Sequence, residues 1–246
     1  MTLHLSQGRA GAISTGLPAE RNRFIGREPE LAALARLLAT GAHLVSVVGP
    51  PGAGKSRLLQ HFAWAAASGF NGGVWFCELA AARGFGAMAR AVAAGLKRAP
   101  AEEAGLRQIG LALAQHGDCL VVLDHFEQIR PQAQAAVAYW LQRAPQARFL
   151  VGGRQRLDLA AERALTLGPL AAQEASALFD HRARAAHSAY APGAEDCAAI
   201  APLLGQLGRW PAAIEAAAAK VRVLGPRAQL ERCFLPQLAQ RGWLPA

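Results

Sequence analysis

Hydrophobic positions in the first two thirds of the chain alternate between two patterns. Short, mainly apolar runs predict strands at residues 43–48, 74–77, 119–123 and 148–151, with a weaker one at 164–167. Between them, apolar residues recur at spacings of three and four and predict helices at 27–40, 55–67, 85–98, 102–115 and 131–143. Strands that are apolar on both faces and separated by helices form parallel sheets covered by helices. This part therefore predicts an α/β fold with a five-stranded parallel sheet.

The pattern changes near residue 170, where the strand signal disappears. Helical spacing continues in four segments separated by glycine and proline, at 172–187, 194–206, 211–223 and 227–239. The first 22 residues are rich in small residues and have no period, which is typical of a flexible tail. We expect a tail at 1–22, an α/β domain at 23–170 and a small all-helical bundle domain at 171–246.

Composition narrows the class of protein. With 246 residues, 52% of them hydrophobic and 17% charged, the chain can bury a sizeable core, which excludes disorder as the main state. None of Cys77, Cys119, Cys197 and Cys233 forms a CxxC pair, which argues against a disulfide scaffold and a zinc site. The sequence begins without a signal-peptide pattern, and its longest uncharged run, 58–77, is interrupted by polar residues and glycines. We expect a cytoplasmic protein without a membrane partner.

The net charge of +9 raises the question of nucleic-acid binding. The basic residues are almost all arginines, and they are spread along the chain rather than gathered in one block. A solvated arginine-rich surface and a phosphate-binding face both account for this distribution. Nucleic acid is a possible partner that no specific motif indicates.

The most specific motif matches GxxxxGK[ST] and lies between a predicted strand and a predicted helix. It comprises Gly49, Pro50, Pro51, Gly52, Ala53, Gly54, Lys55 and Ser56. In this context a glycine-rich loop turns successive backbone N–H groups toward phosphate oxygens, and the helix N-terminus adds a positive field. Lys55 would bind the β- and γ-phosphates, and the Ser56 hydroxyl would bind Mg²⁺. Arg57, in the first turn of the helix, completes the predicted nucleotide-binding segment.

A carboxylate follows the apolar run at 119–123. In a parallel sheet Asp124 lies at the carboxyl edge, where the phosphate loop also lies, and it would hold Mg²⁺ through water. Glu127 could polarise the water that attacks the γ-phosphate. A strand-ending Asp can also be a turn or cap residue, and an exposed Glu that opens a helix would look the same.

Arg154 follows another predicted strand and the pair Gly152-Gly153, so we expect it at the same edge. There its guanidinium could reach a γ-phosphate, although a solvated surface arginine fits the same pattern. The predicted catalytic group is therefore Lys55, Glu127 and Arg154. The histidines, His125 included, show no spacing that suggests zinc.

Five segments of this chain, in order, match motifs of one family. Residues 23–31 are similar to F-V-G-R-E-x-E-L, 123–128 to L-D-N-F-E-Q, 151–157 to T-S-R-x-x-L, 167–179 to L-x-P-L…E-A…L-F, and 207–218 to G-L-P-L-A-I-E. Together they resemble the STAND class of P-loop ATPases, of the NB-ARC-like kind found in bacterial LuxR-type and AfsR-type signalling regulators. His125, Gly152-Gly153 and Arg209-Trp210 depart from the usual residues of these motifs.

The resemblance implies a P-loop NTPase fold, a helical bundle after it, and ATP or ADP with Mg²⁺ as ligands. It also implies that Phe24, Ile25 and Arg27 lie against the adenine and ribose, and that Pro211 packs on the adenine. The implied function is a molecular switch with slow ATP hydrolysis that regulates signalling, transcription or assembly. Its partners would be proteins, or further copies of the chain, engaged when ATP binds.

Two other functions stay open. One is a nucleic-acid-handling AAA-like ATPase of the loader or initiator type, which the net charge favours. The other is a non-hydrolysing adaptor that keeps ADP or ATP as a structural ligand. Hydrolysis that depends on Glu127 would distinguish the switch from the adaptor.

Overall fold

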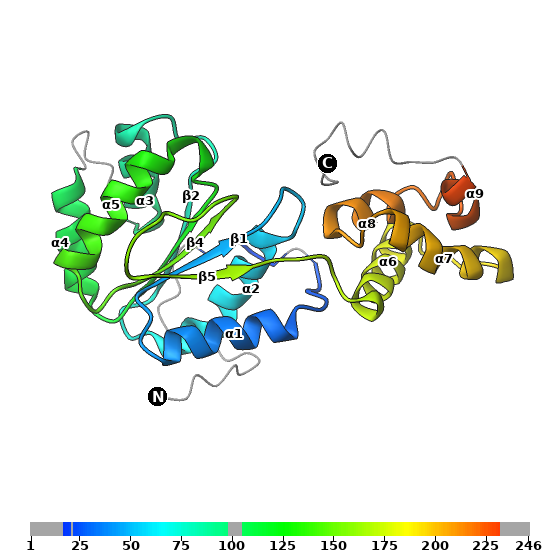
Figure 1. The fold of residues 1–246 in the computed structure, drawn as a ribbon, viewed down its shortest axis with the longest axis horizontal. Coiled ribbons are helices and arrows are strands. Elements are labelled where there is room, and N and C mark those ends of the chain that lie inside the picture. The colour runs from blue at the N-terminus through cyan, green and yellow to red at the C-terminus, as the bar shows by residue number, and fades with distance from the viewer. Residues whose placement is uncertain (1–16, 21, 98–104, 232–246) are drawn as a thin grey trace. The chain divides into compact units, whose positions relative to one another are not determined.

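The computed structural model of this chain describes residues 17–20, 22–97 and 105–231. These residues form two compact units (Figure 1). The first contains Pro29–Gly49, Lys55–Thr166 and the described residues that precede Phe24. The second contains Phe24–Glu28, Pro50–Gly54 and the described residues from Leu167 onward. The predicted tail at 1–22 and helix at 227–239 lie largely outside the described residues, as do 98 and 102–104 of two further predicted helices.

The first unit is built on a five-stranded sheet in the order β2-β3-β4-β1-β5. All four neighbouring pairs are parallel, which confirms the predicted fold class. The strands are β1 (Leu44–Val48), β2 (Val74–Glu78), β3 (Leu120–Asp124), β4 (Arg148–Gly153) and β5 (Glu162–Thr166). In β5 only Glu162 is buried, because this strand lies at the sheet edge. Its sequence signal is weak for the same reason.

Helices cover both faces of this sheet (Figure 1). On one face lie α1 (Glu28–Ala39) and α2 (Lys55–Ala66), which the 3-10 turn η1 (Ala67–Gly69) continues. On the other lie α3 (Phe85–Gly95), α4 (Leu106–His116) and α5 (Arg130–Arg143), the last preceded by the 3-10 turn η2 (Glu127–Ile129). The crossover from β1 to β2 runs in the opposite direction to those from β2 to β3 and from β3 to β4. Right-handed connections therefore put α2 and the group α3–α5 on opposite faces.

The larger hydrophobic core lies under α3, α4 and α5. Trp140 of α5 is fully buried there and stacks on Phe149 of β4, with ring centroids 6.2 Å apart. Its indole N–H donates to the backbone carbonyl of Leu106 at 3.0 Å, so the polar atom of this buried ring is satisfied. This packing fixes the strands whose carboxyl ends carry the candidate site.

The second unit is mainly helical, as predicted for this part of the chain. It contains α6 (Ala172–Ala186), α7 (Ala194–Gln206), α8 (Pro211–Ala218) and α9 (Pro226–Glu231), with α6 packed on α8 and α7 packed on α9. The predicted helix at 211–223 ends at Ala218 and passes into turns before α9. Val221 is still buried whereas Val223 is 89% exposed, so the apolar residues after Ala218 do not share one buried helical face.

Candidate functional site

The phosphate loop connects the carboxyl end of β1 to the start of α2. The Gly49 N–H donates to the carbonyl of Gly153 in β4 at 3.3 Å, and Lys55 Nζ donates to the Gly49 carbonyl at 2.9 Å. Gly52 and Gly54 have φ angles of 81° and 89°. This left-handed conformation favours glycine because a Cβ would strain it. The loop residues thus have the backbone geometry that the motif predicts.

Three charged residues lie within electrostatic reach of Lys55 at this edge of the sheet. Burial lowers the pKa of Lys55, and the positive charge of Arg154 lowers it further, while the carboxylates of Glu127 and Asp124 raise it. These residues come from the start of α2 and from the ends of β3 and β4. The structure therefore brings together the side chains that the sequence nominates for phosphate binding and hydrolysis.

Asp124 is the last residue of β3 and is only 1% exposed. Its Oδ1 accepts a hydrogen bond from the His125 N–H at 3.0 Å, and the side chain also bonds to the Ser56 hydroxyl. Its Oδ2 accepts no hydrogen bond from the described residues but lies 3.3 Å from His125 Nδ1, with which it forms an ion pair when the imidazole is protonated. Burial raises the pKa of Asp124, an effect that the Ser56 hydrogen bond and the His125 charge oppose. A buried carboxylate oxygen beside a hydroxyl suits a divalent cation such as Mg²⁺, which oxygen ligands bind.

Glu127 and Arg154 are more accessible than Lys55 and Asp124. Glu127 is half-buried at the first position of η2, and Arg154 is exposed immediately after β4. Their roles as water-positioning group and phosphate-binding cation stay predictions.

The pair Gly152-Gly153 has a steric reason in this fold. A Cβ on Gly152 would lie 2.4 Å from Leu59 Cδ1 and 2.6 Å from Asp124 Oδ1. A Cβ on Gly153 would lie 2.6 Å from the ring of Phe126. Glycine at both positions therefore leaves room for the side chains of Asp124 and Phe126 at the end of the sheet. The related motif has Thr-Ser in place of these two glycines.

Within the second unit, Arg27 binds the tip of the phosphate loop. Its side chain is 4% exposed and donates to the carbonyls of Ala53 at 3.2 Å and Gly168 at 2.6 Å. Its backbone N–H donates to Glu174 Oε1 at 2.7 Å. Through these bonds Arg27 links the loop to the segment that precedes α6. Its contact with the base stays a prediction.

Pro211, the first residue of α8, lies beside the same part of the loop. A Cβ on Gly54 would be 3.6 Å from Pro211 Cγ, and the Ala212 N–H donates to the Gly52 carbonyl at 3.2 Å. Phe24 and Ile25 are half-buried in this unit. Their predicted contacts with the adenine also stay predictions.

Arg57 points toward the N-terminal segment. Its guanidinium donates to the carbonyl of Asn22 at 2.6 Å. This bond gives Arg57 a structural function, and its predicted part in nucleotide binding stays a prediction.

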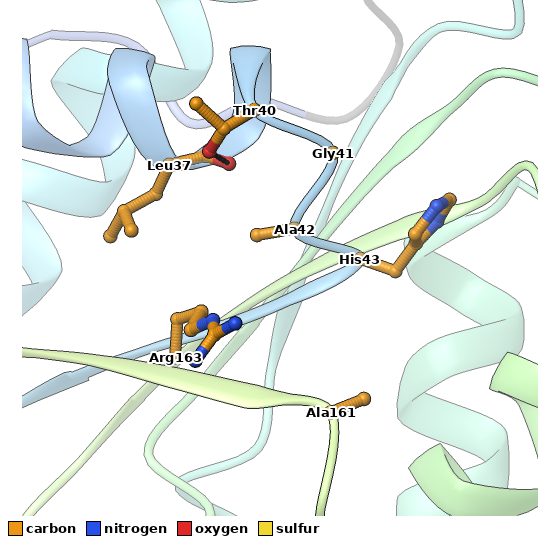
Figure 2. Close-up of a pocket in the computed structure, with 7 residues that line it drawn as sticks. All are labelled: Leu37, Thr40, Gly41, Ala42, His43, Ala161 and Arg163. Carbon is orange, nitrogen blue, oxygen red and sulfur yellow. Dashed lines mark hydrogen bonds between the residues drawn. The ribbon is translucent and has the colours of Figure 1, made fainter.

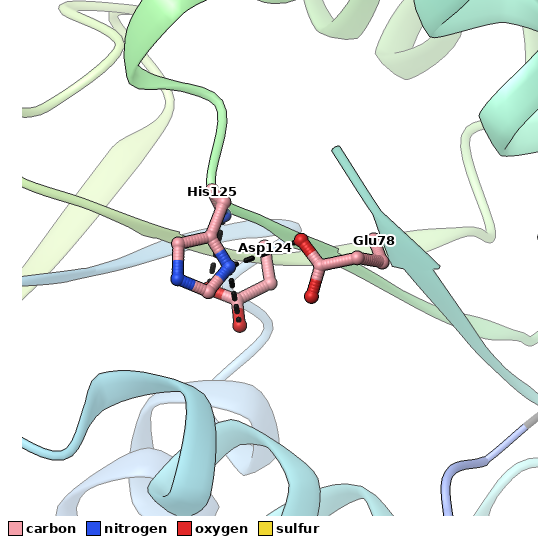
Figure 3. A group of neighbouring side chains, drawn as sticks. All are labelled: Glu78, Asp124 and His125. Carbon is pink, nitrogen blue, oxygen red and sulfur yellow. Dashed lines mark hydrogen bonds and ion pairs between the residues drawn. The ribbon is translucent and has the colours of Figure 1, made fainter. Parts of the chain in front are cut away.

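Sequence reasoning missed Glu78 and gave His125 no role, yet both lie beside Asp124 (Figure 3). His125 Nδ1 is 3.0 Å from Glu78 Oε1 and 3.3 Å from Asp124 Oδ2, and its Nε2 is 3.5 Å from Ser56 Oγ. Glu78 could have been found by the signal that identified Asp124. It ends an apolar strand, and β2 pairs it with Asp124 in register.

A separate hollow of about 330 Å³ lies near the amino ends of β1 and β5 (Figure 2). Its lining contains none of the predicted site residues; it consists of Leu37, Thr40, Gly41, Ala42, His43, Ala161 and Arg163. The candidate site at the carboxyl edge is thus independent of this hollow.

Cys77 and Cys119 are buried free cysteines. Burial raises the pKa of the Cys77 and Cys119 thiols to about 12, so neither is a reactive thiolate near neutral pH. Cys233 lies outside the described residues.

In the part of the chain that the structure describes, no helix has the length and hydrophobicity needed to cross a membrane.

More than half of the chain matches the model of a known protein family. Residues 23–152 match the family described as AAA ATPase domain. Uncharacterized proteins of Mycobacterium tuberculosis and Mycobacterium bovis are 33% identical over 208 residues, which cover 82% of this chain and 52% of each relative. The chain therefore spans about half the length of the curated relatives it matches.

Solved structures share the fold at low sequence identity. A Signal Transduction ATPase with Numerous Domains (STAND) protein from Pyrococcus horikoshii, which has a tetratricopeptide repeat sensor, gives a TM-score of 0.54 at 16% identity, covering 80% of this chain and 30% of that one. Cdc6p from Pyrobaculum aerophilum gives 0.55 at 16% identity, covering 89% and 65%. PCH-2 of C. elegans gives 0.52 at 16% identity, covering 87% and 68%.

Proposed function

This chain belongs to the AAA ATPase domain family, and from that membership we propose that it binds ATP or ADP with Mg²⁺ and hydrolyses ATP slowly. The observation that carries the proposal is the gathering of Lys55, Ser56, Asp124, Glu127 and Arg154 at one sheet edge. Lys55 and the loop N–H groups bind phosphates, and Ser56 and Asp124 hold the cation. Glu127 positions the attacking water and Arg154 stabilises charge on the γ-phosphate.

The finer proposal is a STAND-type switch of the NB-ARC-like kind, in which the bound nucleotide sets a conformation that partners recognise. The five ordered motif matches support it. Signalling, transcription or assembly would then depend on whether ATP or ADP is bound, with self-association or protein partners engaged in the ATP state.

The decisive experiment is a calorimetric titration of Mg-ATP into nucleotide-stripped protein. Lys55→Ala removes the cation that binds the phosphates, and we expect affinity to fall about 10–100-fold. Lys97→Ala, which removes an exposed lysine beyond α3, is the matched control and should leave affinity unchanged. Equal affinity in wild type and Lys55→Ala would refute nucleotide binding at this loop.

Hydrolysis is tested separately through Glu127→Gln. We expect phosphate release to fall by at least about tenfold while ATP affinity is retained, because the amide cannot act as a base. Phosphate release at the wild-type rate would remove Glu127 from the mechanism. No release from wild type would favour the adaptor that keeps its nucleotide.

A second candidate is a nucleic-acid-handling AAA-like ATPase, which the net charge of +9 favours. Binding through phosphate contacts falls steeply as salt rises, since counterions are released. Titration of duplex DNA at several salt concentrations tests this. A steep negative slope of log affinity against log salt supports it, and absence of binding at low salt excludes it.

A further inference from the structure

We propose that Glu78, Asp124 and His125 form a binding site for a first-row transition-metal dication such as Zn²⁺ or Co²⁺. The ligands would be His125 Nδ1, Glu78 Oε1 and Asp124 Oδ2. Within the described ranges, this is the one group of His, Cys, Asp and Glu residues whose ligand atoms meet closely enough to hold a metal. The site requires no nucleotide, although it shares Asp124 with the proposed Mg²⁺ site.

The spacing of the three atoms suits direct coordination. Nitrogen and oxygen ligands lie about 2.0–2.2 Å from Zn²⁺, which puts neighbouring ligands roughly 3.0–3.5 Å apart. His125 Nδ1 lies 3.0 Å from Glu78 Oε1 and 3.3 Å from Asp124 Oδ2, and all three ligand atoms lie within 4.8 Å of one another. A cation can therefore enter with small side-chain movements.

The buried carboxylate supplies an independent observation. Asp124 is 1% exposed, and its Oδ2 accepts no hydrogen bond from the described residues. His125 Nδ1 lies 3.3 Å from this oxygen and forms an ion pair with it only when the imidazole is protonated. With a neutral imidazole, a cation bound by both atoms would satisfy the buried oxygen. The side chains of Glu78 and His125 are 54% and 43% exposed, so solvent gives the cation access to the site.

The fold itself brings the ligands together (Figure 3). Glu78 and Asp124 end neighbouring parallel strands and are paired in register, so both carboxylates lie at one edge. His125 adopts a φ of 60°, in the left-handed region that non-glycine residues seldom occupy. This turn brings the imidazole Nδ1 within 3.3 Å of one oxygen of each carboxylate.

The chemistry of the ligand set selects the cation. Imidazole nitrogen suits Zn²⁺ and other transition metals, whereas Mg²⁺ takes oxygen ligands. With Nδ1 bound to metal, the ring proton lies on Nε2, which faces Ser56 Oγ at 3.5 Å. A bound transition metal would then occupy Asp124 and compete with Mg-nucleotide.

The alternative is that Glu78 and His125 form only a surface hydrogen bond. The chain offers a matched control, because His61 Nδ1 lies 2.7 Å from Glu20 Oε1 in a pair that belongs to no group of three metal-ligating residues among those that the structure describes. If a His–Glu pair were enough to bind metal, both pairs would bind it equally.

The test is a titration of the full nucleotide-free chain with Co²⁺, followed by visible absorption, and with Zn²⁺, followed by calorimetry. We expect one Co²⁺ per chain with an N/O ligand spectrum that excess Mg²⁺ does not abolish. His125→Asn and Glu78→Gln should weaken binding at least about tenfold, whereas His61→Asn should not. Circular dichroism melting verifies that each variant is folded.

Three results would overturn the site: no Co²⁺ binding by wild type, a spectrum dominated by thiolate ligands, or equal binding by wild type and His125→Asn. Mg-ATP affinity is measured on the same samples. Absent Co²⁺ binding with normal ATP binding rejects this inference alone, and Co²⁺ binding without ATP binding rejects only the proposed nucleotide function.

Discussion

At the scale of single residues, the candidate site carries charges that folding alone does not favour. Lys55 and Asp124 are both buried. Burial lowers the pKa of Lys55 and raises the pKa of Asp124, and both shifts favour the uncharged form of the group. Such groups are retained where a ligand neutralises them, as phosphates would for Lys55 and a cation for Asp124. The unliganded protein therefore bears a stability cost at the residues that we expect to bind nucleotide.

The pKa of Asp124 leads to a prediction about stability and pH. Because burial raises the pKa of Asp124 in the folded state above its ordinary value of 3.8, ionised Asp124 destabilises the fold at pH values above the raised pKa. Asp124→Asn should raise the melting temperature of the ligand-free protein by a few degrees at pH 8. The gain should shrink as pH falls through the raised pKa and vanish below 3.8. Thermal melts of both proteins between pH 3.5 and pH 8 test this, and a lower melting temperature for Asp124→Asn at pH 8 would contradict it.

At the scale of elements, the site depends on strand ends that leave room for side chains. β3 and β4 pair Asp124 with Gly152, and the missing Cβ of Gly152 leaves space for the carboxylate and for Leu59 of α2. The same logic explains Gly153 under the ring of Phe126. A substitution in β4 therefore affects the side chain of Asp124 at the end of β3.

Gly152→Ala tests this coupling between β3 and β4. Its Cβ would overlap Leu59 and Asp124, so we expect a loss of about 1–3 kcal/mol in unfolding free energy and weaker Mg²⁺-dependent ATP binding. Gly205→Ala is the matched control: it lies in α7 with open space among the described atoms. There the same substitution should stabilise by about 0.5–1 kcal/mol. Urea unfolding measures both, and equal effects would show that the close contacts at Gly152 carry no cost.

At the scale of the whole molecule, the second unit is assembled from segments that are distant in sequence. Phe24–Glu28 and Pro50–Gly54 join the helical residues from Leu167 onward. Glu174 accepts hydrogen bonds from the backbone N–H groups of Arg27 and Ala171, and Arg27 binds carbonyls of the other two segments. The tip of the phosphate loop is thus held by residues that lie far from it along the chain.

Replacement of Arg27 should disturb this assembly. Arg27→Ala leaves the carbonyls of Ala53 and Gly168 without these donors, and hydrogen bonds from charged groups contribute about 1.5–3 kcal/mol each. We expect a loss of about 3 kcal/mol, or a melting temperature about 6–12 °C lower. Arg184→Ala, which removes an exposed arginine paired with Asp180, should leave the melting temperature unchanged. Equal melting of the two variants would show that Arg27 does not hold the unit together.

The sequence by itself determined the order and type of the elements and the phosphate loop. Apolar runs revealed the buried strands because burial on both faces leaves no polar positions. The loop and its flanking elements were visible because the motif is contiguous, with Lys55 and Ser56 fixed by spacing. The sequence did not determine the helix ends, as the end of α8 at Ala218 shows, because Val221 in the following turns is also buried and continues the apolar pattern.

The tertiary structure decided which distant residues meet. Glu78 and His125 are 47 positions apart, and only the register of β2 and β3 brings the glutamate to Asp124. The steric need for Gly152, the partners of Arg27 and the burial of the Asp124 carboxylate likewise depend on neighbours from other elements. Periodicity and motifs report on contacts within a segment, whereas strand order and packing fix the contacts between segments from which the candidate site is built.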